Sequence, residues 1–445
     1  MTEELRQAVE QVFPGVRADL EALVRIPSVS ADPGHAADLR ACAERVRDLL
    51  TGVGLDVEVL EVPDAPPVVL GTRPAPDGAP TVLLYAHYDV QPAGDLGGWE
   101  ANPFEPVERD GRLHGRGASD DKSGIAIHLG ALRALGDALA VGVTVIVEGE
   151  EELGSPHAEG LLDRYGDRLA ADAIVIADSE HWAVGHPAMT TSLRGLVDAV
   201  VEVRTLEAGV HSGQFGGAIP DAVTSLSRLI ATLHDEHGNC AIEGLVSAPT
   251  PEVDVDESEL RKSSGLLDGV ELVGDGSLAA RMWSRPAVSV LAFEAPRLSE
   301  AINQIVPVAR AKVSLRLAPG EEPRRAMDAL VRHLETHAPW GARVTVTPGS
   351  SAPPFALTQR GGAYQAFADG MAEAWGVAPA EIGVGGSIPL VAMLAERFPD
   401  AAILITGVGE PTSHIHGPGE SQDLGELQRS ILGEALALRA LGNQP

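Results

Sequence analysis

The sequence predicts an α/β fold that is interrupted by a second, smaller α+β domain. Up to Pro187, short runs rich in Val, Ile and Leu alternate with stretches of helical periodicity, and polar residues follow several of these runs. After Pro187 the pattern becomes strand, helix, strand, strand, helix, strand, which is typical of a small α+β sandwich. Helical and apolar stretches resume beyond 350–354. We therefore expect residues 1–187 and 352–445 to form one discontinuous domain and 188–351 to form the other.

The first part of the chain predicts strands and helices in alternation. Three stretches carry apolar residues at helical spacing, at 34–52, 122–135 and 161–169. The short β-rich runs are the expected strands, at 57–60, 68–70, 81–85, 143–147 and 173–176. In a sheet of this kind, ligands bind outside the carboxyl ends of the strands. Residues that directly follow the strands are therefore the first candidates for a functional site.

The insert and the end of the chain are interpreted in the same way. Around a polar stretch at 250–277, the insert is expected to contain strands at 197–203, 288–293, 309–317 and 343–347, and helices at 222–234 and 323–337. Helical or apolar stretches follow at 364–375, 389–397, 402–405 and 424–441. The last candidate ligand, His416, lies beyond the insert, and the others precede it. If they share a site, the two ends of the chain fold together.

Composition argues against several classes of partner. The chain of 445 residues has 33 basic and 64 acidic side chains, and its formal charge of −31 disfavours nucleic acid or an anionic membrane. Its 44% hydrophobic content is that of a soluble globular protein, and no apolar run reaches the ~18 residues that a membrane span requires. Cys42 and Cys240 form no CxxC pair, and residues 1–50 read as amphipathic helix without a signal segment. We expect a cytoplasmic protein.

Acidic residues and histidines gather at the predicted strand ends. In chain order they are His87 and Asp89, Asp120 and Asp121, Glu151 and Glu152, Asp178, and His416. Two histidines with several carboxylates and no cysteine form the ligand set of a two-metal hydrolytic site. Zinc, manganese and cobalt all accept such mixed ligands, and two ions can share one bridging carboxylate.

Taken singly, most of these residues have a second interpretation. His87 is either a metal ligand whose ring is fixed by Asp89, or a turn histidine beside a turn aspartate. Asp120 lies in a Gly-rich stretch directly before a helix, so it either bridges two cations or, like Ser119, caps that helix. Asp178 ends the run 174–177, where an acid more often caps than catalyses.

The acidic cluster of Glu148, Glu150, Glu151 and Glu152 is more informative. Four acids within five residues at the end of an apolar strand repel one another and need cations if any are buried. In water they could form a solvated loop. In a metal site, one carboxylate binds metal while its neighbour takes the proton from metal-bound water. Of His414 and His416, in the Gly/Pro-rich loop, one is expected to be structural or solvent-facing.

Together the motifs carry a resemblance to a known family. In order they are HxDV at 87–90, GRGxSDDK at 115–122, EGxEExGS at 148–155, a strand-end Asp at 178, HSGxxGG at 211–217 and HxPxE at 416–420. This order resembles the dinuclear metallopeptidase family of carnosinases and cytosolic dipeptidases, which also holds acetylornithine deacetylase, succinyl-diaminopimelate desuccinylase and aminoacylases. The resemblance implies a zinc-peptidase-like catalytic domain with an inserted α+β sandwich that serves as lid and dimerisation domain.

The resemblance also implies roles for the acids and histidines. One metal ion would be bound by His87, Asp120 and Asp178, and the other by Asp120, Glu152 and His416. Asp120 would be the bridge, Glu151 the general base and acid, and Asp89 the residue that orients His87, leaving Glu150 outside the metal shell. The implied cofactors are two divalent ions per subunit, with zinc first and manganese or cobalt as alternatives.

Residues of the insert complete the implied site. His211, from HSGxxGG, would stabilise the tetrahedral oxyanion in the active site of the partner subunit of a homodimer. Arg316, Asn303 and Ser387 match positions that grip the carboxylate end of the substrate. For Arg316 the chemistry agrees, because a guanidinium fork binds a carboxylate through two hydrogen bonds, although it could also be a strand-edge surface arginine.

Within the family, an aspartate at the position of Asp178 resembles dipeptidases and aminopeptidases, whereas glutamate is commoner in carboxypeptidases and deacetylases. The leading hypothesis is a metal-dependent dipeptidase that hydrolyses small unblocked peptides with a water bridging two metal ions and Glu151 as general base. The alternatives are an amidohydrolase of N-acyl or N-carbamoyl amino acids and a non-catalytic metal-binding relative. Ser123 and Gly419 depart from the family pattern without removing a ligand.

Overall fold

The chain forms two compact units. A computed structural model describes residues 2–386 and 388–443. The first unit contains residues 1–191, 357–382 and 388–445, and the second contains 192–356 and 383–387. The two ends of the chain therefore belong to the same unit, as expected if the middle of the chain is an insertion. Each unit is built around its own sheet and its own apolar core.

The first unit is organised by a mixed sheet, and the expected α/β class is confirmed. Its strands run in the order β1 (Asp56–Leu60), β2 (Val68–Arg73), β6 (Gly142–Glu148), β3 (Thr81–His87), β7 (Ala173–Ile176), β17 (Ala402–Ile405) and β8 (Ala188–Leu193). The four neighbours β6, β3, β7 and β17 are parallel. The strands β3 and β7 are buried almost throughout, because side chains on both faces of a central strand pack beneath helices.

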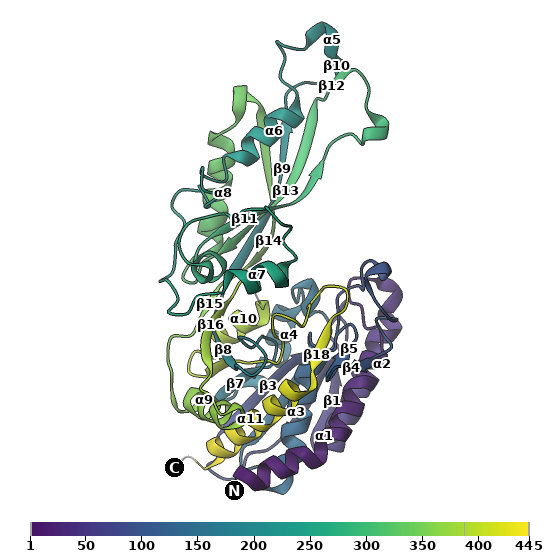
Figure 1. Ribbon diagram of the computed structural model, residues 1–445, viewed down its shortest axis with the longest axis vertical. Helices are drawn as coiled ribbons and strands as arrows, with labels where there is room; N and C mark the ends of the chain where they lie inside the picture. Colours follow the sequence, from purple (N-terminus) through teal and green to yellow (C-terminus); the bar gives the residue numbers. More distant parts are fainter. Residues whose placement is uncertain (1, 387, 444–445) are drawn as a thin grey trace. The chain divides into compact units, whose positions relative to one another are not determined.

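Helices cover this sheet. They are α1 (Thr2–Val24), α2 (Ala36–Gly52), α3 (Lys122–Leu135), α4 (Ala158–Tyr165), α9 (Gly362–Trp375), α10 (Pro389–Arg397) and α11 (Leu424–Gly442). In Figure 1, α11 lies beside α3 and α9, so the C-terminal segment packs on elements from the first third of the chain. The amphipathic helix expected over 1–50 is in fact two helices. Pro27 explains the break, because proline lacks the N–H and disfavours helical backbone at the preceding residue.

A small sheet that the sequence did not predict holds the late histidine loop in place. It runs β18 (Ser421–Asp423), β5 (Arg112–His114) and β4 (Val107–Arg109), with Ser421 opposite His114. This pairing joins the residues after His416 to the residues just before the glycine-rich turn at 115–121. Two segments that are 300 residues apart in sequence therefore approach the same place.

The second unit is the expected α+β sandwich. Its main sheet runs β11 (Ala287–Glu294), β13 (Val308–Leu317), β9 (Gly195–Arg204) and β14 (Arg343–Ala352), all antiparallel. The helices α6 (Ala222–Ala231) and α8 (Pro323–Thr336) pack on it. Short elements complete the unit: β10 (Val210–His211), α5 (Ser212–Phe215), α7 (Glu257–Ser264), a π-helix (Ala280–Ser284) and β12 (Gln304–Ile305). The polar stretch at 250–277 therefore contains one helix.

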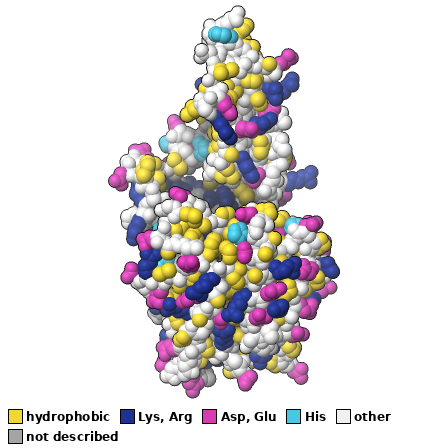
Figure 2. Space-filling model, turned by 90° about the vertical axis from the view of Figure 1, so that its right-hand side faces the viewer, with side chains coloured by type: hydrophobic (Ala, Val, Ile, Leu, Met, Phe, Trp, Pro, Cys, Tyr) yellow, Lys and Arg dark blue, Asp and Glu magenta, His cyan; other side chains and the backbone are white. Residues whose placement is uncertain are grey.

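The chain passes between the units within β8, after β15 (Phe355–Ala356), and around β16 (Ala380–Val384). Acidic and basic side chains are interspersed on the face that Figure 2 shows. Among the described residues, no helix combines the length and the apolar character needed to cross a membrane.

Candidate metal centre

His87 is fixed at the carboxyl end of β3 by contacts on both ring nitrogens. The ring is fully buried. Its Nδ1 lies 3.0 Å from the backbone oxygen of Asp89 and 3.3 Å from the Asp89 carboxylate. Its Nε2 lies 3.0 Å from Oδ1 of Asp120 and 3.9 Å from Oδ1 of Asp178. A ligand histidine is commonly oriented by such a contact on its other nitrogen, and Asp89 provides one here.

Asp120 lies between two histidines. Its Oδ1 contacts His87, and its Oδ2 lies 2.9 Å from Nε2 of His416. The same His416 nitrogen is 3.1 Å from Oε2 of Glu152. Each oxygen of Asp120 thus faces a different imidazole, which is the arrangement of a carboxylate that bridges two ions.

The potential metal ligands form two groups. One contains His87, Glu151 and Asp178, and the other contains Asp120, Glu152 and His416, with candidate ligand atoms within 4.8 Å of one another in each group. All five residues expected as ligands therefore converge, and Glu151 lies among them. The donors are imidazole nitrogens and carboxylate oxygens, which suit two divalent cations of the zinc, manganese and cobalt type.

The turn that presents Asp120 is held by a buried glutamate from the other end of the chain. Glu420 accepts hydrogen bonds from the backbone N–H groups of Gly117, Ser119 and Asp120 at 3.0, 3.0 and 3.1 Å. It also accepts one from Nη1 of Arg116 at 2.7 Å. Sequence reasoning included Glu420 in a motif but gave it no role. Its burial in a Gly/Pro-rich loop is explained by these four donors.

Asp121, the neighbour of the bridging residue, has a different function. Its carboxylate accepts from the N–H of Gly124 at the start of α3 and from the N–H of His87. Burial raises its pKa well above the usual value. Of the two adjacent aspartates, Asp120 therefore faces the centre, and Asp121 caps the helix behind it.

The acidic cluster divides into structural and functional members. Glu148 accepts from the Tyr85 hydroxyl at 2.7 Å and from Ser155 at 3.0 Å, and Glu150 accepts from His157. Neither belongs to the metal-binding groups, whereas Glu151 and Glu152 do.

The carboxylate of Asp89 fixes the turn that carries Glu151 and Glu152. It accepts from the N–H of Glu151 at 3.2 Å and from that of Glu152 at 3.1 Å. Asp89 therefore positions the acid turn in addition to the ring of His87. This second contact spans more than 60 residues of sequence, and no local pattern predicts it.

Electrostatics indicate that the centre is built for cations. Burial, together with neighbouring carboxylates, raises the pKa of Asp178 and of Glu151 well above their usual values. Hydrogen bonds to Asp120 and Glu152 raise the pKa of His416 to about 10. The protein thus retains protons where carboxylates crowd together, and bound divalent cations would take over that compensation.

His211, Asn303 and Arg316, expected to act on the substrate, lie in the second unit. His211 is exposed at the start of α5, and its Nδ1 accepts from the N–H of Gly213 at 3.0 Å. The backbone oxygen of Asn303 accepts from Ser212. Ser387 lies outside the described residues.

Arg316 lies on β13 beside a second arginine, Arg194, to which the sequence analysis assigned no role. Arg194 donates to the backbone oxygens of Gly385 and Arg281, and burial followed by the charge of Arg316 lowers its pKa to about 10. Arg316 is partly buried, and burial lowers its pKa as well. No carboxylate in the described part of the chain pairs with either guanidinium. Two adjacent cations without a counter-ion suit an anionic group such as a substrate carboxylate.

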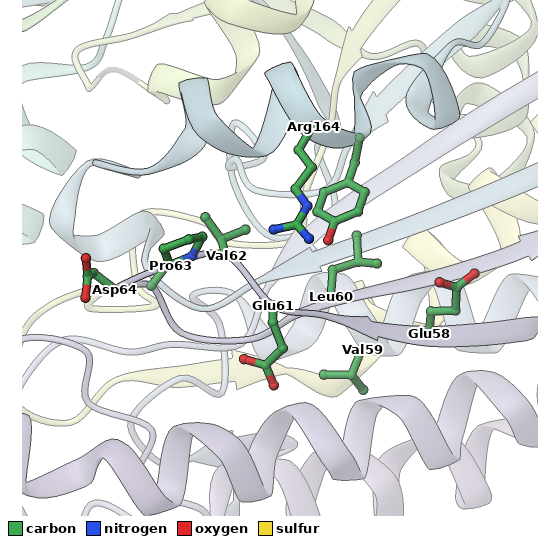
Figure 3. Close-up of a pocket in the computed structure, with 10 residues that line it drawn as sticks. Glu58, Val59, Leu60, Glu61, Val62, Pro63, Asp64 and Arg164 are labelled. Atoms are coloured by element: carbon green, nitrogen blue, oxygen red, sulfur yellow. The ribbon is translucent and has the colours of Figure 1, made fainter.

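Hollows on the described part of the first unit include one beside β1 and one beside the His416 loop. One, of about 610 Å³, lies beside β1, and Arg164 from α4 points toward the segment that carries Glu58 and Glu61 (Figure 3). None of the expected site residues lines it. The other, of about 450 Å³, is lined by Trp99, His114, His414 and Pro418, among others, and thus borders the loop that carries His416. None of the proposed metal ligands lines this second hollow.

Fold and site together define a hydrolase of the dinuclear-metal class. The chain matches the model of peptidase family M20/M25/M40 over residues 83–438, and it belongs to that family. It is 38% identical over 431 residues to a cysteinylglycine-S-conjugate dipeptidase of Corynebacterium striatum, covering 95% of both chains. It is 29% identical over 409 residues to a Beta-Ala-His dipeptidase of Rattus norvegicus, covering 85% of this chain and 82% of that one.

Solved structures of two dipeptidases have a fold similar to that of this chain. The structure of human carnosine dipeptidase 1 has a TM-score of 0.84 and 26% identity, covering 99% of this chain and 98% of that one. The fold of the di-peptidase Dug1p from Saccharomyces cerevisiae is equally similar, with a TM-score of 0.85 at 22% identity, covering 100% and 99%. The predicted family is confirmed, and these relatives place the chain with its dipeptidase subgroup.

Proposed function

We propose that the protein is a metal-dependent dipeptidase that hydrolyses the peptide bond of small unblocked peptides. The observation that carries the proposal is Asp120, which offers one oxygen to His87 and the other to His416 between two groups of potential metal ligands. The 38% identity to a dipeptidase along almost the whole chain supports the same substrate class.

In the proposed site, His87, Asp120 and Asp178 hold one cation, and Asp120, Glu152 and His416 hold the other. When bound, the two ions would polarise the scissile carbonyl and lower the pKa of the attacking water towards ~7. Glu151 takes the proton from that water and returns it to the leaving amine. Asp89 keeps both His87 and the Glu151 turn in place.

Zinc is our first choice for both ions, with manganese and cobalt as alternatives, because all three accept imidazole and carboxylate ligands. We also propose a cytoplasmic location, which fits two cysteines that are both free.

The second unit contains His211, Arg316 and Asn303 among the remaining proposed residues. We assign residues 1–187 and 352–445 to a catalytic domain and 188–351 to a lid and dimerisation domain. Arg316, together with Asn303 and Ser387, would bind the substrate carboxylate. The uncompensated charge of Arg316 beside Arg194 supports the role of Arg316.

A homodimer is supported by an apolar edge of the second unit. The strand β11 pairs only with β13 among the described strands, and its Val290, Leu291 and Phe293 side chains are 40%, 60% and 44% exposed. Leu298, shortly after the strand, is 97% exposed. An unpaired strand edge with exposed apolar residues is a natural surface for a second copy.

We predict that His211 acts in the site of the partner subunit. His211→Ala alone is expected to lower kcat by about 10²-fold or more, the usual loss for one oxyanion donor, with unchanged metal content. A hybrid dimer of one His211→Ala chain and one Glu151→Gln chain, isolated through two different affinity tags, contains one complete site. It is expected to recover about half of the wild-type kcat. An inactive hybrid would place His211 in its own subunit's site, and a near-normal kcat of the single variant would exclude the role.

The proposed function is tested by comparing a free dipeptide with its N-acetyl and N-carbamoyl counterparts. We expect hydrolysis of the free peptide only. Preference for the blocked compounds would make the protein an amidohydrolase. Bound metal without turnover of any of these substrates would identify a non-catalytic relative.

A further inference from the structure

Almost every acid around the centre already has a partner. Asp89, Asp121, Glu148, Glu150 and Glu420 accept the hydrogen bonds described above. Glu410 accepts from Arg112 at 2.6 Å and from Thr412. The remaining acids, Asp120, Glu151, Glu152 and Asp178, belong to the metal-binding groups. Glu180 is the exception, because no described residue forms a hydrogen bond or an ion pair with its side chain.

Glu180 lies at the edge of the centre, two residues after Asp178. Its backbone forms a bridge with Gly409, and the charged groups that act on its partly buried carboxylate are Asp120, Glu410 and His416. A Cβ atom added at Gly409 would lie 3.2 Å from Cγ of Glu180 and 3.4 Å from Oγ of Ser119. The Glu180 and Ser119 side chains therefore approach the same point beside Gly409, where Cδ1 of Ile415 lies 2.9 Å from the added Cβ atom.

Ser119 provides an independent observation at this point. Its Oγ is buried and has no hydrogen-bond partner in the described part of the chain. A buried hydroxyl without a partner costs free energy, so such a group commonly marks the place of a ligand or a water. Among the described residues, Ser119 Oγ and the Glu180 carboxylate both lack a partner, and both side chains approach Gly409 close to the ligand Asp120.

The balance of charge around the centre indicates which kind of group Glu180 and Ser119 would bind. Two divalent cations carry four positive charges, and the ligands Asp120, Asp178 and Glu152 with the base Glu151 carry four negative ones. The ligands and the base therefore balance the two ions, and an ionised Glu180 would add a negative charge that they do not offset. Arg112 is paired with Glu410 and therefore does not compensate for it. A positively charged group on the substrate would balance the charge of the Glu180 carboxylate.

We propose that Glu180, with Ser119 beside it, binds the free α-ammonium group of the peptide substrate and so selects unblocked peptides. This inference rests on the proposed dipeptidase function and names the residue that determines its specificity. An ammonium group offers three N–H donors, which a carboxylate and a hydroxyl oxygen can accept. An N-acyl substrate has a neutral amide there, and would leave the Glu180 charge without a partner in a partly desolvated site.

The test measures the preference for an ammonium group directly. L-Ala-Gly and N-propionylglycine differ only in that hydrogen replaces the ammonium group in the second compound. Wild-type enzyme is expected to favour L-Ala-Gly in kcat/KM. Glu180→Gln is expected to reduce this preference by about 10- to 100-fold, the usual effect of losing a charged hydrogen bond, with most of the change in KM for L-Ala-Gly. Glu180→Asp, which keeps the charge, is expected to retain part of the preference.

Two controls separate the possible failures. Glu159→Gln removes the same charge from an exposed position on α4 and is expected to leave the preference unchanged. Metal content per chain, measured by mass spectrometry, is expected to be equal in Glu180→Gln and wild type. A Glu180→Gln variant with the full wild-type preference, or one that loses metal, would overturn the assignment of Glu180. A wild type that does not favour L-Ala-Gly would instead contradict the proposed function.

Discussion

Replacing Glu151 with glutamine is expected to lower kcat by about 10³-fold while both metal ions stay bound. The loss is that of a general base and acid, whose contribution is typically 10²- to 10⁴-fold. Glutamine has nearly the same shape but cannot take the proton from water. Steady-state kinetics with a free dipeptide, together with metal analysis of the same preparation, measures both quantities.

The two neighbouring glutamates provide matched controls for this result. Glu150→Gln changes a side chain that accepts from His157, so most of the kcat should remain. Glu152→Gln removes a proposed ligand that contacts His416 and is expected to lower the metal content. If Glu151→Gln lost metal and Glu152→Gln kept it, the roles of the two residues would have to be exchanged.

Asp120→Asn is expected to abolish the dinuclear centre and, with it, activity. Asp120 contacts both His87 and His416, and its charge lies between the two groups of ligands. Without that charge, two cations at close distance repel each other with little compensation, so we expect about one ion per chain or fewer. Metal analysis after dialysis measures this directly.

Asp121→Asn is the matched control for this substitution. An asparagine side chain can still cap α3 through its oxygen, although its NH₂ group cannot accept from the N–H of His87, so we expect a modest effect. We expect two ions per chain and, at most, a loss of about 10- to 100-fold in metal affinity, as for residues behind the ligands. Retention of two ions by Asp120→Asn would contradict the bridging role.

Much of this site could be predicted because its residues follow apolar strands. The runs before His87, Glu148 and Asp178 are buried parallel strands, which are recognised by their Val, Ile and Leu content. Strand ends in such a sheet converge at one edge, so the local pattern contains information about a distant contact. The same reasoning identified the two ends of the chain as one folding unit.

The roles of the supporting residues could not be predicted in this way. The role of Glu420 depends on backbone N–H groups some 300 positions earlier in the chain. The hydrogen bonds that Asp89 accepts from the Glu151 turn connect the end of one strand with the end of the next. The small sheet that aligns the His416 loop consists of three-residue strands, too short for a periodic pattern. Glu180 drew no attention because a single acid in a polar segment has no sequence signature. Its significance lies in the absence of a partner, which only a structure can reveal.

The most direct test of the account is a metal titration followed by dipeptide hydrolysis. The protein would be stripped of metal with a chelator, and zinc, manganese or cobalt would be returned in known molar ratios while hydrolysis of L-Ala-Gly and metal content are measured together. We expect no activity in the stripped protein and full activity at about two ions per chain. Hydrolysis that persists without metal, or that is complete with a single ion, would contradict a dinuclear centre bridged by Asp120.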